Sequence, residues 1–450
     1  MLYVIWLKYS SGENTMILKD KIQEQLPSWR ERVKNLVKEK GEVKVGEVTI
    51  AQVYGGMRDV KSLVTDISYV DPAEGIRIRG YTIPEVLDKL PKPKDSEMPY
   101  VGGLYYLFLV GSIPTEEQAL EVEAEWKKRG KVPQYVYDAI RALPADTHPM
   151  TLFTLAVLTL QRESLFSKQY HEGLKRDSYW EPMLEDSLNL TAKLPEIAAF
   201  IYRLKYKNGD IIAADPTLDW AGNFAHMMGI KDHLYEDLSR LYFLLHSDHE
   251  SGNVSAHTTH LVASSLSDIY YAASAGLCGL AGPLHGLANQ ECLSWLLDVK
   301  EKCGECTYDK SALRQFAWDT LNKGLVIPGY GHAVLRKTDP RYTAQLEFGK
   351  KYFPEDEIFK LAALVYDVVP EVLREQGKAK DPWPNVDAIS GSLQYHFGIK
   401  EFDFYTVMFG VSRILGVSAN AVWARALNQP IERPKSLTTE MLEEIAAKAN

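Results

Sequence analysis

Residues 279 to 291 read Gly-Leu-Ala-Gly-Pro-Leu-His-Gly-Leu-Ala-Asn-Gln-Glu. The first three of these residues are the end of a longer stretch, Val254 to Ala281, that is rich in Ala, Ser, Leu and Gly and poor in charge. Such a composition suits helices packed closely in an interior. Gly282 and Pro283 stop the helical run and let the backbone turn sharply before His285 and Gly286. The stretch therefore predicts a helical core that ends in a turn carrying a histidine.

Helical periodicity also dominates the chain on both sides of this turn. Apolar residues recur at three- and four-residue steps over 19–38, where Pro27 can bend the helix, and over 234–245 and 358–374. A further helix is predicted from about Ser311 to Lys323, with Gly324 at its end. Asp339 and Pro340 predict an N-cap and a first-turn proline for the helix after it. The predicted fold class is mainly α.

A minor antiparallel β component is predicted near the N-terminus. One alternating run contains Val43, Val45, Val48 and Ile50, and a second contains Ile76 and Ile78 just before Gly80. Thr82, with Glu85 three residues later, forms a capping box that predicts the start of the next helix. We expect one or two small sheets followed by helices.

The chain has 450 residues, which is longer than a single hydrophobic core usually supports. We expect a large domain made of residues 1–286 and 391–450 and a small domain made of residues 287–390. The net charge of -9 argues against a general nucleic-acid-binding surface. Any anionic ligand must then be bound by local clusters of Arg and Lys.

Four Cys in a chain of this length are too few for a disulfide scaffold and favour a reducing compartment. The apolar run from Met1 to Leu7 is too short to span a bilayer and lacks the basic segment of a signal peptide. We therefore expect no membrane association. The cytoplasm is the simplest expectation, with the mitochondrial matrix as the alternative if a transit peptide is missing from the sequence.

Two more turns combine Gly or Pro with an ionisable residue. They are Pro328-Gly329-Tyr330-Gly331-His332 and Trp383-Pro384-Asn385-Val386-Asp387. A single His or Asp in a turn is more often structural, because both side chains readily bind backbone groups. Two His and one Asp together suit removal of a proton next to a carbonyl, with the imidazoles stabilising the oxygens that gain charge.

Several arginines suit recognition of carboxylates. Arg336 and Arg341 follow the second turn, while Arg413 and Arg433 lie beside apolar residues. A lone Arg is usually solvated or paired, but a guanidinium in an apolar context can hold a carboxylate through two parallel hydrogen bonds. These residues are therefore candidates for binding an acidic substrate.

Longer runs of sequence resemble those of the citrate synthase family, in the family's order and over residues 17 to about 440. They are Tyr54-Gly55-Gly56-Met57-Arg58, Ser247-Asp248-His249-Glu250, the stretch 279–291, Pro328-Gly329-Tyr330-Gly331-His332-Ala333, Pro384-Asn385-Val386-Asp387 and Glu432-Arg433-Pro434-Lys435-Ser436. The resemblance is closest to the long-chain type found in mitochondria. It implies an almost all-α fold in which a small domain closes over a large one, and condensation of acetyl-coenzyme A with oxaloacetate to give citrate.

The resemblance also implies the roles of individual residues. Asp387 would remove a methyl proton from acetyl-coenzyme A, His285 would bind the enol or enolate oxygen, and His332 would polarise the carbonyl of oxaloacetate. The carboxylates of oxaloacetate and citrate would be bound by His249, Arg341, Arg413 and an Arg433 from a second subunit. A homodimer with shared active sites is therefore expected.

For the coenzyme, the resemblance implies the side chains of Arg58, Arg336, Lys378, Lys380 and Asn385, together with Arg176 from across the dimer. Backbone around Val326, Gly329 and Ala333 would hold the adenine. No cofactor is expected to be bound permanently, because acetyl-coenzyme A and coenzyme A are substrate and product.

Three alternatives remain open from the sequence. A 2-methylcitrate synthase would use propionyl-coenzyme A, and one methylene changes binding in an apolar pocket by only ~1–3 kcal/mol. The same enzyme can also work in the direction of citrate cleavage. A metal enzyme is the third alternative, because His246, His249, His257 and His260 form two His-x-x-His pairs. We expect no metal, because the resemblance assigns His249 to the substrate.

Overall fold

The computed structural model describes residues 16–304, 307–331, 334–379 and 381–449. Its helices and strands, in chain order, are α1 (Ile17–Lys40), α2 (Ile50–Tyr54), β1 (Ser68–Asp71), β2 (Gly75–Ile78), β3 (Tyr81–Thr82), α3 (Ile83–Lys89), α4 (Val101–Val110), α5 (Glu116–Arg129), α6 (Gln134–Arg141), α7 (Pro149–Thr159), η2 (Leu160–Glu163), α8 (Leu165–His171), η3 (Arg176–Ser178), α9 (Trp180–Tyr206), α10 (Trp220–Met228), α11 (His233–His246), α12 (Val254–Ser264), α13 (Ile269–Leu280), α14 (Ala288–Cys303), α15 (Lys310–Asn322), α16 (Pro340–Tyr352), α17 (Glu357–Gln376), α18 (Asp387–His396), η5 (Phe402–Phe404), α19 (Tyr405–Ala426) and α20 (Thr439–Lys448). The predicted fold class, mainly α with a minor antiparallel sheet, is confirmed.

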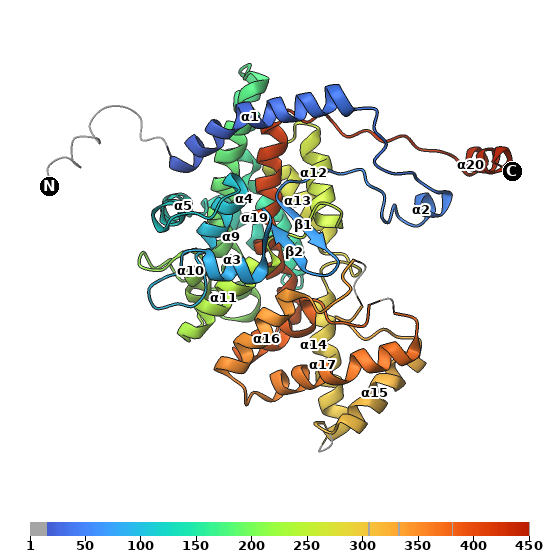
Figure 1. Cartoon of the computed structure of the whole chain (residues 1–450). Coiled ribbons are helices and arrows are strands. Elements are labelled where there is room, and N and C mark those ends of the chain that lie inside the picture. Colours follow the sequence, from blue (N-terminus) through green and yellow to red (C-terminus); the bar gives the residue numbers. More distant parts are fainter. Residues whose placement is uncertain (1–15, 305–306, 332–333, 380, 450) are drawn as a thin grey trace.

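Helix α19 lies at the centre of the larger group of helices, where it packs against α4, α9, α11, α12 and α13 (Figure 1). Nearly all of its residues are buried. Phe402–Ala426 is long and apolar enough to cross a membrane, but 94% of its most apolar window is buried inside the protein. A central core helix has the same length and composition, so this helix is weak evidence for a membrane span.

Helices α14 to α18 form a second group, which lies below the first in Figure 1. Within it, α18 packs against α14, α16 and α17, and α15 packs against α14 and α17. The predicted capping residues appear in this group, because the Asp339 side chain accepts a hydrogen bond from Arg341 N and Pro340 occupies the first turn of α16. The expected domain boundary after residue 390 falls inside α18.

The small sheet has the order β1-β2-β3 and both pairings are antiparallel, with Ser68 opposite Ile78 and Ile78 opposite Tyr81. The predicted capping box is present, since Thr82 and Glu85 bond each other's backbone at the start of α3. The predicted strand over residues 43–50 is wrong. Those residues are coil up to the short helix α2, and Val43 and Val45 are 64% and 69% exposed. A strand needs a neighbouring strand for its backbone hydrogen bonds, and none lies beside this segment among the described residues.

Two segments extend away from the body of the molecule. Figure 1 shows α2 and α20 on the same side, α2 within one long irregular stretch and α20 at the end of another. The Tyr54 hydroxyl lies 2.8 Å from Thr439 Oγ1. Apolar side chains on these segments, among them Ile431, Leu437 and Met441, are exposed. We call residues 41–66 and 429–449 the arms.

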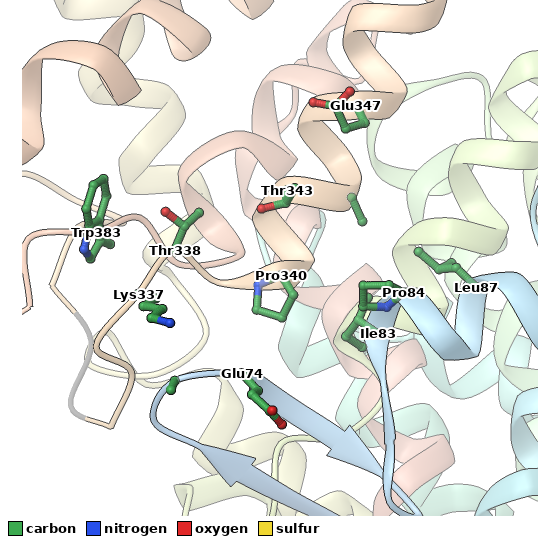
Figure 2. Close-up of a pocket in the computed structure, with 12 residues that line it drawn as sticks. Glu74, Ile83, Pro84, Leu87, Lys337, Thr338, Pro340, Thr343, Glu347 and Trp383 are labelled. Carbon is green, nitrogen blue, oxygen red and sulfur yellow. The ribbon is translucent and has the colours of Figure 1, made fainter.

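The β1–β2 hairpin connects the two groups of helices. Arg336 N donates a hydrogen bond of 2.7 Å to Pro72 O, and the hairpin turn at Gly75 packs directly on the Pro340 ring. A cavity of about 710 Å³ lies at this junction. It is lined by Glu74 of the hairpin and by Lys337 and Thr338 of the segment that leads into α16 (Figure 2). The hairpin therefore fixes the segment that leads into α16 and carries Arg336 and Arg341.

Candidate active site

The second and third Gly/Pro turns pair with each other. Asn385 N donates to Gly329 O at 2.9 Å, Gly331 N donates to Trp383 O at 3.2 Å, and Tyr330 forms an isolated antiparallel bridge with Pro384. Gly329 has φ +77°, and a Cβ there would lie 2.5 Å from the Cys292 sulfur. Only glycine allows this approach. The pairing brings the second turn against the start of α18, whose first residue is Asp387.

The Asp387 carboxylate is almost enclosed, with a side chain that is 14% exposed. Burial raises its pKa to about 6, Arg341 and Arg413 oppose that shift, and Asp339 adds to it. The Asp387 backbone N–H is held by Asn385 Oδ1 at 2.9 Å, which fixes the start of the helix. A carboxyl group with this pKa is ionised at neutral pH and is a stronger base than an exposed aspartate.

His285 faces the N-terminus of α12. Its Nε2 accepts a hydrogen bond from Ser255 N at 3.2 Å, and Ser255 Oγ lies 2.9 Å from the same nitrogen. Burial, helped by the charge of Arg413, lowers the His285 pKa to about 4. The ring is therefore neutral, and because Nε2 accepts, the proton is carried by Nδ1. A neutral imidazole in this tautomer can donate one hydrogen bond to a substrate oxygen.

Arg413 lies under the same helix terminus. Its Nη1 donates to Asn253 Oδ1 at 2.9 Å and to Ser255 Oγ at 3.3 Å, and its Nε donates to His246 O at 3.3 Å. The side chain is buried, and burial lowers its pKa to about 10, with Asp248 partly opposing the shift. The charge of Arg413 lowers the pKa of both His285 and Asp387, so this cation lies near both side chains.

Arg341 is the second buried cation at the site. Its Nη2 donates to Asp339 Oδ2 at 2.7 Å, and both residues lie at the start of α16. The charge of Arg341 lowers the pKa of Asp387, so the two side chains lie near each other. Asp387, His285, Arg341 and Arg413, which the sequence predicted as site residues, are therefore brought together.

The structure adds His246, which the sequence indicated only as one member of a His-x-x-His pair. Its Nδ1 is 2.9 Å from Tyr242 O, its ring stacks on Tyr242, and its Nε2 lies 4.0 Å from Asp387 Oδ1. Burial is the main cause that lowers the His246 pKa to about 3, so the ring is neutral. The His246-x-x-His249 pair was the available signal, but it did not indicate contact with the third turn.

The loop after α11 places His249 close to Arg413. Asn253 Nδ2 donates to His249 O at 3.0 Å, and Asn253 is also the residue that binds Arg413. Strand β1 holds the same loop, because Ser68 Oγ donates to Asp248 Oδ2 at 2.6 Å and Glu250 N donates to Ser68 Oγ at 2.8 Å. His249 thus belongs to the same region as the four residues above.

The candidates for coenzyme binding are more scattered. Gly329 and Asn385 are adjacent, whereas Val326, Arg336 and Lys378 are exposed on the second group of helices. Arg176 belongs to η3, which packs against α9 in the larger group, and Arg58 belongs to the arm 41–66. His332, Ala333 and Lys380 lie outside the described residues. One chain therefore does not gather all the predicted coenzyme residues in one place.

The second His pair is engaged elsewhere. His257 Nε2 is 3.3 Å from Glu432 Oε2 and His260 Nε2 is 3.0 Å from Glu432 Oε1. These contacts fasten the base of the C-terminal arm to α12 and leave the next residue, Arg433, exposed. In the part of the chain that the structure describes, no group of three or more His, Cys, Asp or Glu side chains is arranged to hold a metal ion.

Comparisons with known proteins agree with this geometry. The family description "citrate synthase, C-terminal domain" matches residues 56–435. The chain is 49% identical over 447 residues to citrate synthase 4, mitochondrial, of Arabidopsis thaliana, covering 99% of this chain and 94% of that protein. It is 51% identical over 441 residues to the mitochondrial citrate synthase of Xiphias gladius, covering 98% of this chain and 94% of that protein.

A solved structure supports the fold. It is the ternary complex of carboxymethyl coenzyme A and oxaloacetate with the citrate synthase of Thermoplasma acidophilum. The likeness covers 87% of this chain and 97% of that chain, with a TM-score of 0.72 and 22% sequence identity. At that sequence identity, the likeness shows a shared fold only.

Proposed function

The chain belongs to the citrate synthase family, and from that premise we propose how its residues join the acetyl group of acetyl-coenzyme A to oxaloacetate. The products are citrate and coenzyme A. The observation that carries the proposal is that Asp387, a buried carboxylate with a pKa of about 6, and His285, a neutral imidazole with a pKa of about 4, both lie near the buried cation Arg413. Such a pair suits enolisation at neutral pH.

In the first step, Asp387 removes a proton from the methyl group of the thioester. Even with a raised pKa, a carboxylate is a weak base against a thioester methyl group, so the barrier must fall mainly through stabilisation of the enolate oxygen. His285 supplies that stabilisation by donating its Nδ1 proton. Ser255, which bonds Nε2, keeps the ring in the required tautomer.

In the second step, the enol carbon attacks the carbonyl of oxaloacetate, and His332 polarises that carbonyl. The support is the pairing of its turn with the turn of Asp387, since Gly331, the residue just before His332, bonds Trp383 O. Arg341, Arg413 and His249 bind the carboxylates of oxaloacetate. The citryl thioester formed in this step is then hydrolysed.

We propose that Arg433 completes the site of a second copy of this chain. Arg433 is exposed on the arm 429–449, which leaves the body of its own chain just after its anchor at Glu432 (Figure 1). The outer faces of α12 and α13 also expose Val254, Leu261 and Tyr271, which suits a subunit interface. The active assembly is thus a homodimer with shared sites.

The two groups of helices correspond to a large domain and a small domain. We propose that the second group, α14 to α18, closes as a unit over bound oxaloacetate. It carries Asp387 and Arg341, while His285 and Arg413 belong to the first group and the loop joining them. Closure would bring these halves together and exclude water before the thioester becomes reactive.

The coenzyme enters as a substrate and no permanently bound cofactor is proposed. Gly329 and Asn385, with Arg336 and Lys378, would form the part of its site that one chain supplies, and Arg58 and Arg176 would complete it. Few cysteines favour a reducing compartment inside the cell, and the mitochondrial names of both relatives favour the matrix over the cytoplasm.

The test is release of free thiol from acetyl-coenzyme A, with and without oxaloacetate, and with propionyl-coenzyme A in parallel. We expect release that requires oxaloacetate and favours the acetyl substrate. Asp387→Asn should lower turnover by a factor of roughly 10²–10⁴. The control, Asp367→Asn, removes an exposed carboxylate paired with Lys310 on the same group of helices and should retain turnover. Equal turnover of the two variants would exclude Asp387 as the base.

A further inference from the structure

Asn289 lies in the first turn of α14, and its side-chain amide is buried against α18. The residue is 3% exposed, and neither its Nδ2 nor its Oδ1 has a hydrogen-bond partner of normal geometry among the described residues. A Cβ at Gly391 would lie 2.6 Å from Asn289 Oδ1, so the amide packs directly on that glycine. Gly391 is four residues after Asp387 in α18, and positions four apart share a helix face. Asn289 therefore lies one helical turn along α18 from Asp387.

The Tyr242 hydroxyl reaches the same place from α11. Tyr242 is 1% exposed, and its hydroxyl oxygen also has no hydrogen-bond partner of normal geometry in the described part of the chain. Burial is the main cause that raises the pKa of this phenol, the charge of Asp387 raises it further, and Asn289 opposes the shift. The phenol therefore lies near both residues. Its ring stacks on His246, with 4.1 Å between the ring centroids, which fixes its position beside the base.

Three buried polar atoms thus lie close to Asp387, namely Tyr242 Oη, Asn289 Nδ2 and Asn289 Oδ1. Unpaired buried polar atoms are costly, and buried polar groups in proteins normally bond one another or an internal water molecule. The charge of Asp387 acts on Tyr242, but the hydroxyl makes no hydrogen bond to the carboxylate. Polar groups that are near each other but too far apart to bond directly suit a bridging water molecule.

We propose that Tyr242 and Asn289 hold one water molecule against the side of Asp387 that faces α11 and α14. Both are then positioning residues for the base, and the proposal rests on the proposed function, in which Asp387 is that base. An amide that lowers the pKa of a phenol acts as a donor to its oxygen, so Asn289 leaves the Tyr242 O–H free to donate to the water. The water in turn donates a hydrogen bond to the carboxylate.

This water has a defined effect on the base. A donor to the ionised carboxylate favours the ionised form and lowers the pKa of Asp387. It also holds the carboxylate in one orientation, which a base must keep while it removes a proton from a carbon atom.

The other titratable groups near the carboxylate are contributed by several elements, and they are Arg341 and Asp339 at the start of α16, Arg413 of α19, His246 of α11 and Cys292 of α14. Helix α17 also packs on α18, and its N-cap Asp356 bonds His396 at the opposite end of that helix. Replacing Tyr242 by Phe changes none of these groups and keeps the ring that stacks on His246. An effect of the substitution on the base is therefore an effect of the hydroxyl.

The first test is the pH dependence of kcat/KM for acetyl-coenzyme A, measured on the full chain and on Tyr242→Phe. We expect the pH below which kcat/KM falls to be higher by roughly one unit in the variant, because the carboxylate has lost a hydrogen bond that favours its ionised form. Turnover is then roughly fivefold below that of the wild type at about pH 6 and equal to it above about pH 8. A variant that is impaired equally at every pH would overturn the proposal, since a purely structural role predicts that result.

Tyr206→Phe is the matched control. It also removes a buried hydroxyl that has no hydrogen-bond partner in the described residues, but Tyr206 ends α9, where its charged neighbours are Asp403 and Glu401. Its pH profile should coincide with that of the wild type. An equal shift in Tyr206→Phe and Tyr242→Phe would mean that the shift does not come from contact with the base, and it would overturn the proposal.

Asn289→Leu tests whether the two residues act through the same water. It replaces the amide by an apolar side chain of similar size, and it should shift the profile in the same direction as Tyr242→Phe. The double variant should shift it no further than Tyr242→Phe alone, because the water is already lost. Shifts that add would show two independent effects and would overturn the shared water. If Asn289→Leu does not fold, the conservative Tyr242→Phe variant and its control decide.

A crystal structure tests the water directly and needs no turnover. In the wild type we expect a water molecule within hydrogen-bond distance of Tyr242 Oη and of the Asp387 carboxylate, and in Tyr242→Phe we expect that molecule to be lost or displaced. A wild type in which the phenol bonds the carboxylate directly, or in which no water joins them, would overturn the proposal. A wild type that forms no citrate would instead refute the proposed function and leave the crystallographic result valid.

Discussion

The Nε2 atom of His246 lies 4.0 Å from the Oδ1 atom of Asp387. The histidine is buried, its Nδ1 bonds the Tyr242 carbonyl, and its ring is neutral, so a lone pair on Nε2 faces the base. In the proposed mechanism Asp387 takes a proton from the substrate and thereby becomes a hydrogen-bond donor. A shift of about 1 Å would let that proton bond His246, which makes His246 a residue that positions the protonated base.

Replacing this histidine tests its effect on the base. His246→Phe keeps an aromatic ring against Tyr242 but removes the lone pair, and one hydrogen bond contributes about 0.5–1.5 kcal/mol. We expect kcat to fall roughly two- to tenfold, with a smaller change in KM for oxaloacetate. His171→Phe is the matched control, because His171 Nδ1 also bonds a carbonyl four residues earlier but is exposed. A loss of oxaloacetate affinity without loss of kcat would contradict the role.

The pH dependence of kcat/KM for acetyl-coenzyme A follows from the raised pKa of Asp387. A base acts when ionised, so activity should fall as the pH drops through about 6, and by about tenfold for each further unit. His285, with a pKa of about 4, stays neutral over that range. If kcat/KM instead falls only near pH 4, the ordinary pKa of a carboxyl group, the proposed base is not buried.

The same shift has a consequence for stability. A carboxyl group whose pKa is raised on folding binds more protons in the folded state, so stability is lost as the pH rises from about 4 to about 6. The loss is on the order of 3 kcal/mol, because one pKa unit corresponds to about 1.4 kcal/mol. The unfolding free energy of Asp387→Asn should lack this loss between pH 4 and pH 6. If the unfolding free energies of the wild type and the variant change in parallel with pH, Asp387 does not cause the loss.

The hairpin junction can be tested at Gly75. A Cβ at this position would lie 2.4 Å from Pro340 Cδ, so Gly75→Ala must push the hairpin away from the start of α16. We expect a loss of about 1–3 kcal/mol in unfolding free energy and a higher KM for oxaloacetate, because Arg341 follows Pro340. Gly80→Ala is the control, since Gly80 also has a positive φ but has nothing within 4 Å of its Cβ position. Equal effects of the two substitutions would attribute the loss to backbone strain alone.

Most of the fold could be predicted because helical periodicity and capping residues are local signals. Thr82 with Glu85, and Asp339 with Pro340, marked helix starts that the structure contains. The strand predicted from Val43 to Ile50 is wrong because alternation of apolar and polar residues shows only that the side chains are compatible with a strand. Whether such a segment pairs depends on a neighbouring strand, and that is a property of the tertiary structure.

The site was predictable where Gly and Pro force turns, and less so where contacts join distant segments. The turns gave Asp387 and His285, and the apolar neighbours of Arg413 indicated a buried cation. The same signal, Trp423-Ala424-Arg425-Ala426, was present at Arg425 and would have indicated its burial. The approach of His246 to Asp387 could not be read from spacing, because it depends on how α11 packs beside α18.

The proposed sharing of the active site between subunits leads to a prediction about mixed dimers. If Arg433 acts on the partner's site, a subunit with Arg433→Ala keeps its own Asp387, and a subunit with Asp387→Ala keeps the Arg433 that the first one needs. Each variant alone is then inactive, but a mixed dimer has one complete site. Equal mixing gives half of the dimers in the mixed form, so about a quarter of wild-type activity should return after subunit exchange. Activity is measured by thiol release and the mixed dimer is verified by two different affinity tags. No recovery in verified mixed dimers would mean that Arg433 serves its own subunit, and the exposed arm would then need another explanation.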